Sequence, residues 1–142
     1  MPDPRVTPAL RRVVYERAKG CCEYCRSQAN FTTESFAVEH INPRRAGGAT
    51  VLDNLALSCF GYNSHKHIKT SGIDPLTDER VPLFHPRLQQ WSDHFTWANN
   101  FTEIVGLTAI GRATIVTLQF NRNEVINLRR VLHKVGEHPP QE

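Results

Sequence analysis

The chain has 142 residues, of which 39% are hydrophobic and 22% are charged, and its formal net charge is +3. This length and composition exclude a disordered chain and predict a soluble globular protein that is long enough to bury its own core. The small positive charge permits an anionic partner without requiring one.

No apolar stretch approaches the ~20 residues that a membrane-spanning helix needs, so we expect no membrane partner. The first ten residues, MPDPRVTPAL, lack the apolar core of a signal peptide, and we therefore expect a cytoplasmic protein. In that compartment the four cysteines are expected to be metal ligands or buried thiols rather than disulfides.

The first predicted element is a helix of about ten residues that begins after Thr7. Thr7 is a typical N-cap and Pro8 a typical first helical residue, and apolar residues follow at helical spacing. Gly20 ends the helix and leads the chain into a turn that contains Cys22 and Cys25.

Two short strands are predicted next. Residues 35–41 (SFAVEHI) alternate between two faces, and Pro43 ends this strand. A loop rich in Gly and Arg leads to a second short apolar stretch at residues 54–57 (NLAL). A polar helix is expected over residues 59–69, and the pair at residues 74–75 (DP) ends the unit.

The second half of the chain is expected to contain a hairpin and helices. Residues 94–107 suggest two strands around a turn at Asn99 and Asn100. Residues 113–120 are helix or strand by pattern, and helix is favoured; Asn123 then caps a last amphipathic helix. Three basic residues are expected on the solvated face of that helix: Arg129, Arg130 and Lys134. Four aromatic residues are expected in the core: Trp91, Phe95, Trp97 and Phe101.

The most informative stretch is residues 38–66, VEHINPRRAGGATVLDNLALSCFGYNSHK. Its parts occur in a fixed order: an acid-His pair, a proline, two glycines, Asn-Leu, a cysteine, and then an asparagine and a lysine. With the pair Cys22 and Cys25 in front, this order resembles the HNH endonuclease family over about residues 20–70. Because so many elements agree in order and spacing, the signal is far more specific than a lone short motif.

The resemblance implies an α+β fold with a β-β-α metal core, in which a hairpin carries the acid-His pair and a following helix carries the last ligand. We expect a helix and a zinc-knuckle-like turn before this core. A C-terminal hairpin and helices are expected over about residues 71–142. No linker is long enough to separate two domains, so we expect a single nuclease domain over residues 1–142.

The resemblance also implies roles for individual residues. His40 would be the general base that activates water, and Asn54 would hold the hairpin loop and orient the His40 ring. Glu39 and Asn63 would bind Mg²⁺ or another divalent ion, because hard cations prefer oxygen ligands. Taken singly, Asn54 is more often a turn residue and Asn63 a helix cap. Three basic residues are expected to contact phosphate: Arg44, Arg45 and Lys66.

The cysteines leave two readings open. In the family four cysteines bind a structural zinc ion, and here Cys22, Cys25 and Cys59 occupy three of the places while Tyr62 occupies the fourth. A neutral phenol is a poor zinc ligand. Either His65, one helical turn further on, completes the zinc site, or Tyr62 packs over a metal-free thiol cluster.

The pattern therefore predicts a metal-dependent endonuclease that hydrolyses phosphodiester bonds in DNA, as a nicking monomer or as a homodimer that cuts both strands. RNA is an alternative substrate. The competing prediction is a non-cleaving nucleic-acid-binding module that retains the HNH fold.

Overall fold

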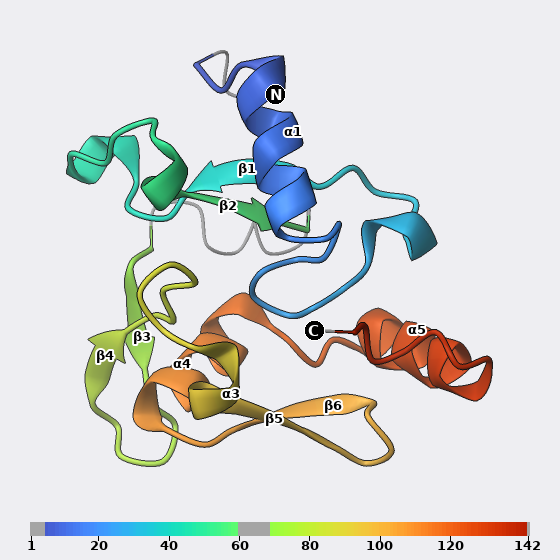
Figure 1. Cartoon of the computed structure of the whole chain (residues 1–142). Coiled ribbons are helices and arrows are strands. Elements are labelled where there is room, and N and C mark those ends of the chain that lie inside the picture. Colours follow the sequence, from blue (N-terminus) through green and yellow to red (C-terminus); the bar gives the residue numbers. More distant parts are fainter. Residues whose placement is uncertain (1–4, 60–68, 142) are drawn as a thin grey trace. The chain divides into compact units, whose positions relative to one another are not determined.

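The computed structural model describes residues 5–59 and 69–141, and Figure 1 shows their helices and strands. The chain divides into two compact units. The first comprises Met1–Thr70 with His85–Arg87, and the second comprises Ser71–Phe84 and Leu88–Glu142. Helices and small antiparallel sheets occur in both units, which confirms the predicted α+β class. The expected single nuclease domain over residues 1–142 stays a prediction.

The first unit begins with helix α1, Pro8–Arg17. The side-chain oxygen of Thr7 accepts a hydrogen bond from the amide of Leu10 at 3.2 Å, as expected for an N-cap. Gly20 has a φ of 69°, and its amide donates to the carbonyl of Tyr15, so the chain leaves the helix through a left-handed residue. The predicted helix and its end are therefore confirmed.

Strands β1, Ala37–His40, and β2, Leu55–Ser58, form an antiparallel pair. The register places His40 opposite Leu55, at the end of the hairpin where the connection between the strands begins. Both strands that the sequence predicts in this region are present.

Helix α1 packs on this hairpin through a small apolar core. Val14 from the helix is buried together with Val6, Leu55 and Leu57. Burying one such side chain stabilises a fold by roughly 1.5–3 kcal/mol. At the end of the helix, the guanidinium of Arg17 donates to the carbonyl of Leu55 at 2.6 Å. Apolar burial and this hydrogen bond together fix α1 on β2.

Three short 3-10 helices lie in the described connections of the first unit: η1, Ala29–Phe31, η2, Arg44–Ala46, and η3, Leu52–Asn54. The first follows the turn that contains Cys22 and Cys25, and the other two lie in the connection between β1 and β2. The polar helix expected over residues 59–69 falls mainly on residues 60–68, which lie outside the described residues.

The described residues of the second unit form two hairpins and three helices. The hairpins pair β3, Ser71–Ile73, with β4, Arg80–Pro82, and β5, Phe95–Ala98, with β6, Glu103–Gly106. The helices are α3, Trp91–His94, α4, Ala109–Leu118, and α5, Asn123–Lys134. The predicted turn at Asn99 and Asn100 is confirmed, and both residues have positive φ. The β3–β4 hairpin was not among the sequence predictions.

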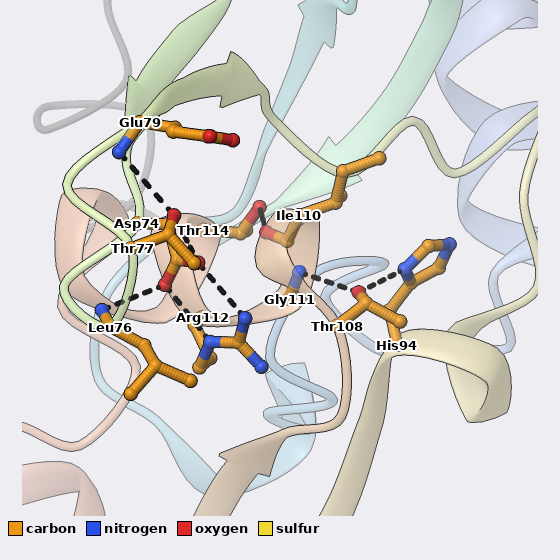
Figure 2. Close-up of polar contacts among 10 residues, drawn as sticks. All are labelled: Asp74, Leu76, Thr77, Glu79, His94, Thr108, Ile110, Gly111, Arg112 and Thr114. Atoms are coloured by element: carbon orange, nitrogen blue, oxygen red, sulfur yellow. Dashed lines mark hydrogen bonds and ion pairs between the residues drawn. The ribbon is translucent and has the colours of Figure 1, made fainter.

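A buried carboxylate organises the turn between β3 and β4 (Figure 2). Asp74 is fully buried, and its two oxygens each accept a hydrogen bond of 2.9 Å from the guanidinium of Arg112 on α4. The amide of Leu76 and the hydroxyl of Thr77 donate to the same carboxylate. The pKa of Asp74 is held well below its ordinary value in spite of its burial. The largest cause is the hydrogen bonding from Arg112, and the hydrogen bonds from Leu76 and Thr77 add to it.

Two threonines attach α4 to its surroundings. The hydroxyl of Thr108 accepts a hydrogen bond from the amide of Gly111 at 3.0 Å and lies 2.6 Å from Nδ1 of His94 (Figure 2). The hydroxyl of Thr114 accepts a hydrogen bond from the amide of Phe84 at 2.9 Å. These contacts join α4 to the end of α3 and to the segment that follows β4.

The expectation that Arg129 lies on a solvated helix face is wrong. Arg129 is only 4% exposed, and its guanidinium donates to the carbonyls of Thr102 and Phe120. Its central carbon also lies 5.5 Å from the ring centroid of Trp97. A guanidinium has five donors, so one buried side chain can satisfy several carbonyls at once. The other two basic residues of that face are exposed, as expected: Arg130 and Lys134.

Other expectations for the second unit are corrected in detail. The last helix begins at Asn123, so its N-cap is Arg122 and not Asn123. Trp91 and Phe95 are buried, which confirms their place in the core, whereas Phe101 is 39% exposed because it follows the tip of the β5–β6 turn. Among the described helices, none is long and apolar enough to cross a membrane.

Asp74→Asn should lower the melting temperature at pH 7 much more than Asp78→Asn, because Asp78 is exposed in the same turn. The folded-state pKa of Asp74 is depressed, so its stabilisation is present above its unfolded pKa of about 3.9 and is lost as the pH falls towards the folded value. The difference in melting temperature between wild type and Asp74→Asn should therefore become smaller below about pH 4. Thermal denaturation followed by circular dichroism measures this gap, and a gap that stays constant down to acidic pH contradicts the assignment.

Candidate active site and metal centre

Three cysteines of the first unit converge on one point. Cys22 and Cys25 lie in the turn after α1, and Cys59 follows β2 directly. Their sulfur atoms all lie within 4.8 Å of one another, and all three residues are buried. The cysteine turn, defined here as residues 21–28, therefore meets the end of the β1–β2 hairpin at a thiol cluster.

Glu23 attaches the cysteine turn to strand β2. Its amide donates to the carbonyl of Leu57 at 2.9 Å, and its side-chain Oε2 accepts a hydrogen bond from the amide of Leu57 at 2.8 Å. Both main-chain groups of Leu57 are thus bound by one residue of the turn. Because Cys59 is two residues beyond Leu57, this pairing sets its sulfur beside those of Cys22 and Cys25.

The cluster fits three corners of a zinc site. Tetrahedral zinc with Zn–S bonds of about 2.3 Å implies sulfur–sulfur distances of about 3.8 Å, and the sulfurs of Cys25 and Cys59 are 4.0 Å apart. Burial, together with hydrogen bonds to the other two thiols, raises the pKa of the Cys22 thiol well above its ordinary value. Zinc binding requires thiolates, so binding would release these protons. Both candidates for the fourth position, Tyr62 and His65, lie outside the described residues.

Glu39 and the cysteine turn are joined by Tyr24. The phenol of Tyr24 is fully buried and donates a short hydrogen bond to Oε1 of Glu39, which is itself 8% exposed. Burial, and then the negative charge of Glu39, raise the pKa of Tyr24 well above its ordinary value, so the phenol stays a donor. The carboxylate expected to bind a cation is thus held in place by a residue between the cysteines.

His40, the next residue of β1, has a different partner. Its Nε2 lies 2.8 Å from the hydroxyl of Thr50, in the connection between β1 and β2. The ring is half-buried. Neighbouring residues of a strand point to opposite faces, and the separate contacts of Glu39 and His40 agree with this alternation.

Asn54 closes the connection that carries Thr50. Its Oδ1 accepts from the amide of Asn42 at 2.8 Å, and its Nδ2 donates to the carbonyls of Asn42 and Ala49 at 3.0 and 2.9 Å. At Gly48, a Cβ atom would lie 1.8 Å from the carbonyl oxygen of Asn42, so no side chain fits there. The second glycine of the pair is therefore required by close packing of the backbone.

Of the three basic residues expected at the site, two lie among the described residues. Arg44 and Arg45 are both exposed in η2, which ends at Gly47 with a φ of 91°. Asn63, expected as an oxygen ligand, and Lys66, expected as a phosphate contact, lie outside the described residues.

Four residues of this region were missed by sequence reasoning: Glu23, Tyr24, Thr50 and Arg87. Arg87 forms an ion pair with Oε1 of Glu23, and burial followed by the charge of Arg17 lowers its pKa to about 10. The segment PLFHPR, which contains Arg87, carried no assigned role in the sequence. The other three have no periodic or spacing signal, because each matters through a partner more than nine residues away.

Residues 22–69 match the HNH endonuclease family model. The matched segment contains the thiol cluster, the adjacent Glu39 and His40, and the loop closed by Asn54. No curated protein and no solved structure matches the chain.

We expect the purified chain to hold one zinc ion and Cys59→Ser to lose it, because two thiolates and a hydroxyl bind zinc poorly. The melting temperature should fall with the metal content. Cys21→Ser is the matched control, since the Cys21 thiol contacts the carbonyl of Lys19 and is not part of the cluster. Elemental analysis after purification without chelator measures the metal. Zinc-free wild-type protein would instead identify a metal-free thiol cluster.

Proposed function

We propose that this chain, which carries an HNH domain over residues 22–69, is a metal-dependent endonuclease that hydrolyses phosphodiester bonds in DNA. The family match supports nuclease chemistry at the level of the reaction class. One observation supports a working site in this chain: the His40 ring is held by a loop hydroxyl, and a buried carboxylate, Glu39, is its neighbour on the strand.

His40 is the proposed general base. An imidazole is neutral to a large extent at pH 7 and can accept a proton there. Its contact with Thr50 orients the ring before substrate binds, which lowers the cost of reaching a reactive geometry. The ring takes a proton from water, the water oxygen attacks phosphorus, and the ester P–O bond on the opposite side breaks.

Glu39 and Asn63 are the proposed ligands of a divalent cation. A carboxylate offers about four acceptor positions, so a hydrogen bond from Tyr24 does not by itself prevent Glu39 from binding a cation. The two residues supply oxygen ligands, which suit Mg²⁺ and similar hard ions. When bound, such an ion neutralises charge at the scissile phosphate and at the leaving oxygen.

Arg44, Arg45 and Lys66 are the proposed phosphate contacts. Arg44 and Arg45 are exposed on the same connection that carries Thr50, four and five residues after His40 in sequence. Guanidinium groups bind phosphate oxygens in a bidentate geometry, which fixes the position of a strand without reading its bases.

A nicking assay tests the proposal against a non-cleaving nucleic-acid-binding module. Supercoiled plasmid is incubated with the protein and Mg²⁺, Mn²⁺ or Ni²⁺, and EDTA serves as the control. Nicked or linear DNA that forms only without EDTA supports the nuclease. Plasmid binding without scission under every ion would favour the binding module.

His40→Ala should lower the cleavage rate by about 10²–10⁴-fold and leave DNA binding nearly unchanged, because only the proton transfer is lost. The change in plasmid nicking rate under a fixed divalent-ion concentration measures this. His133→Ala, on α5 of the second unit, is the control and should keep wild-type cleavage. A His40→Ala protein that cuts at the wild-type rate would remove His40 from the mechanism.

Arg44→Ala should weaken DNA binding and make it less sensitive to salt. Each phosphate contact on duplex DNA contributes about 0.9 to the slope of log K against log salt concentration. Fluorescence anisotropy of a labelled duplex at several salt concentrations measures the slope. Arg130→Ala, an exposed arginine on α5, should leave it unchanged. An equal slope for wild type and Arg44→Ala would exclude Arg44 as a phosphate contact.

A further inference from the structure

A groove lies between helix α1 and the β1–β2 hairpin of the first unit, and we call it the α1 groove. Its volume is about 330 Å³, which is in the range of sites that hold a small molecule. The hairpin side is apolar and consists of the half-buried Phe36 and Val38 and the buried Leu57. The helix side is polar and is formed by four residues of α1: Arg11, Arg12, Tyr15 and Glu16. One wall of the groove is therefore apolar, and the other carries charges and an aromatic ring.

The helical repeat explains why these four residues share one side of α1. Positions 11 and 15, like positions 12 and 16, are four residues apart and are neighbours on the helix surface. The wall contains two arginines and one glutamate, so its formal charge is positive. Arg12 and Glu16 are exposed, and within residues 5–59 and 69–141 neither side chain has a hydrogen-bonded or ion-paired partner. Both side chains are therefore available to a ligand.

The α1 groove lies on the face of the hairpin that carries His40. Val38 and His40 are two residues apart on β1, and alternate residues of a strand share a face. The register agrees, because Val38 packs on the core that contains Leu55, the residue paired with His40. Since a strand rises ~3.3 Å per residue, Val38 is roughly 7 Å and Phe36 roughly 13 Å along the strand direction from His40. A DNA strand advances about 3.4 Å per nucleotide along the duplex axis, so the groove is roughly two to four nucleotides from a phosphate at His40.

The side chains of the α1 groove match the parts of a nucleotide. Tyr15 is 41% exposed, so its ring offers a face on which a base stacks. A guanidinium binds phosphate oxygens, and Arg12 supplies one. A carboxylate accepts hydrogen bonds from an amino group on the edge of a base, and Glu16 supplies that acceptor. A lipid chain or an acidic peptide would leave Glu16 next to apolar or negative groups, so these ligands match the groove less well.

We propose that the α1 groove binds one unstacked nucleotide of the substrate strand, with Arg12 on its phosphate, Tyr15 on the face of its base and Glu16 accepting from the edge of the base. This inference rests on the proposed nuclease function and adds a site of sequence preference to it. Adenine, guanine and cytosine each carry an exocyclic amino group, whereas thymine presents the O4 acceptor in place of the amino group of cytosine. The groove therefore discriminates against thymine, because two acceptors repel each other.

Binding of short single strands tests the groove without cleavage. Fluorescein-labelled octamers of deoxycytidine and of thymidine are titrated with the full chain at pH 8 in EDTA, and anisotropy gives each Kd. Single strands avoid the cost of extruding a base from a duplex. Wild type should bind the deoxycytidine octamer about 2–10-fold more tightly, the range for one hydrogen bond. Glu16→Gln should remove the difference, because its amide offers both a donor and an acceptor. Equal affinities in wild type, or a difference that survives in Glu16→Gln, overturn the proposal.

The stacking role of Tyr15 is measured with the same octamers. Tyr15→Ala should weaken the binding of both by about 5–100-fold, the range for the loss of one base–aromatic stack, whereas Tyr15→Phe keeps the ring and should bind like wild type. Val13→Ala, at an exposed position of α1 outside the groove, is the control and should leave both affinities unchanged. Circular dichroism verifies the fold of each variant. Wild-type affinity in Tyr15→Ala, or an equal loss in Tyr15→Phe, overturns the proposal.

The phosphate contact of Arg12 is measured by the salt dependence of binding. One phosphate contact on a single strand contributes about 0.7 to the slope of log K against log salt concentration. Arg12→Ala should lower the slope for both octamers by this amount, and Arg130→Ala, on α5, should leave it unchanged. An unchanged slope in Arg12→Ala overturns the placement of the phosphate.

The positions of the cuts connect the groove to the reaction. The ends of nicked plasmid are sequenced for wild type and for Glu16→Gln. Thymine should be depleted in wild type at one position roughly two to four nucleotides from the cut, and this depletion should be absent in Glu16→Gln. The same base frequencies in both proteins contradict a role of the groove in sequence preference.

The measurements separate the two possible failures. If octamer binding depends on Tyr15 and Glu16 but no divalent ion supports plasmid cleavage, the nuclease function fails and the α1 groove stands as a nucleotide-binding site of a non-cleaving module. If plasmid is cut and neither variant changes octamer affinity or the bases at the cuts, the nuclease function stands and the inference about the groove is overturned.

Discussion

The side chain of Asn54 closes the connection between β1 and β2, and the arrangement of the proposed site depends on this closure. Its amide makes three hydrogen bonds to the main chain at Asn42 and Ala49. Each such bond contributes about 0.5–1.5 kcal/mol, which is enough together to hold one loop conformation against many open ones. The strand pairing alone would leave residues 41–54 without a fixed path, and Thr50 would not meet His40.

A second constraint joins the cysteine turn to the same hairpin. Glu23 binds both main-chain groups of Leu57, and Arg87 pairs with the remaining oxygen of its carboxylate. A buried carboxylate is costly unless it is paired and hydrogen-bonded, and Glu23 is both. This carboxylate and the main-chain amide of the same residue attach the cysteine turn to β2, close to the three clustered thiols.

The local elements were predictable because each depends on neighbouring residues. Thr7 and Pro8 mark the start of α1, and Asn99 and Asn100 mark a hairpin turn, through backbone preferences that act over a few positions. The order of the candidate site residues was also recognisable from the sequence, because members of a family keep the spacing between these residues. The roles of all the expected site residues, and the identity of a fourth zinc ligand, stay predictions.

What the sequence did not reveal are side chains whose partners are distant in the chain. Arg129 follows the pattern of a solvated helix face, yet carbonyls of Thr102 and Phe120 surround its guanidinium. Asp74 precedes a proline and is typical of a turn, yet it is buried and forms an ion pair with Arg112, 38 residues later. The periodicity of a sequence predicts which face of a helix or strand is apolar. It does not predict which arginine will be buried against carbonyls or a carboxylate that are distant in the chain.

The hydrogen bond between Tyr24 and Glu39 connects the two parts of the first unit that the family pattern treats separately. Tyr24 lies between two of the clustered cysteines, and Glu39 lies on the strand that carries His40. Because the phenol is fully buried and its pKa is raised, it stays a donor at neutral pH and keeps one carboxylate oxygen engaged. The remaining oxygen can then point in only a limited set of directions. The geometry of the proposed cation ligand therefore depends on the shape of the cysteine turn, which gives the thiol cluster a structural part in the site although none of its sulfurs lies on the strand.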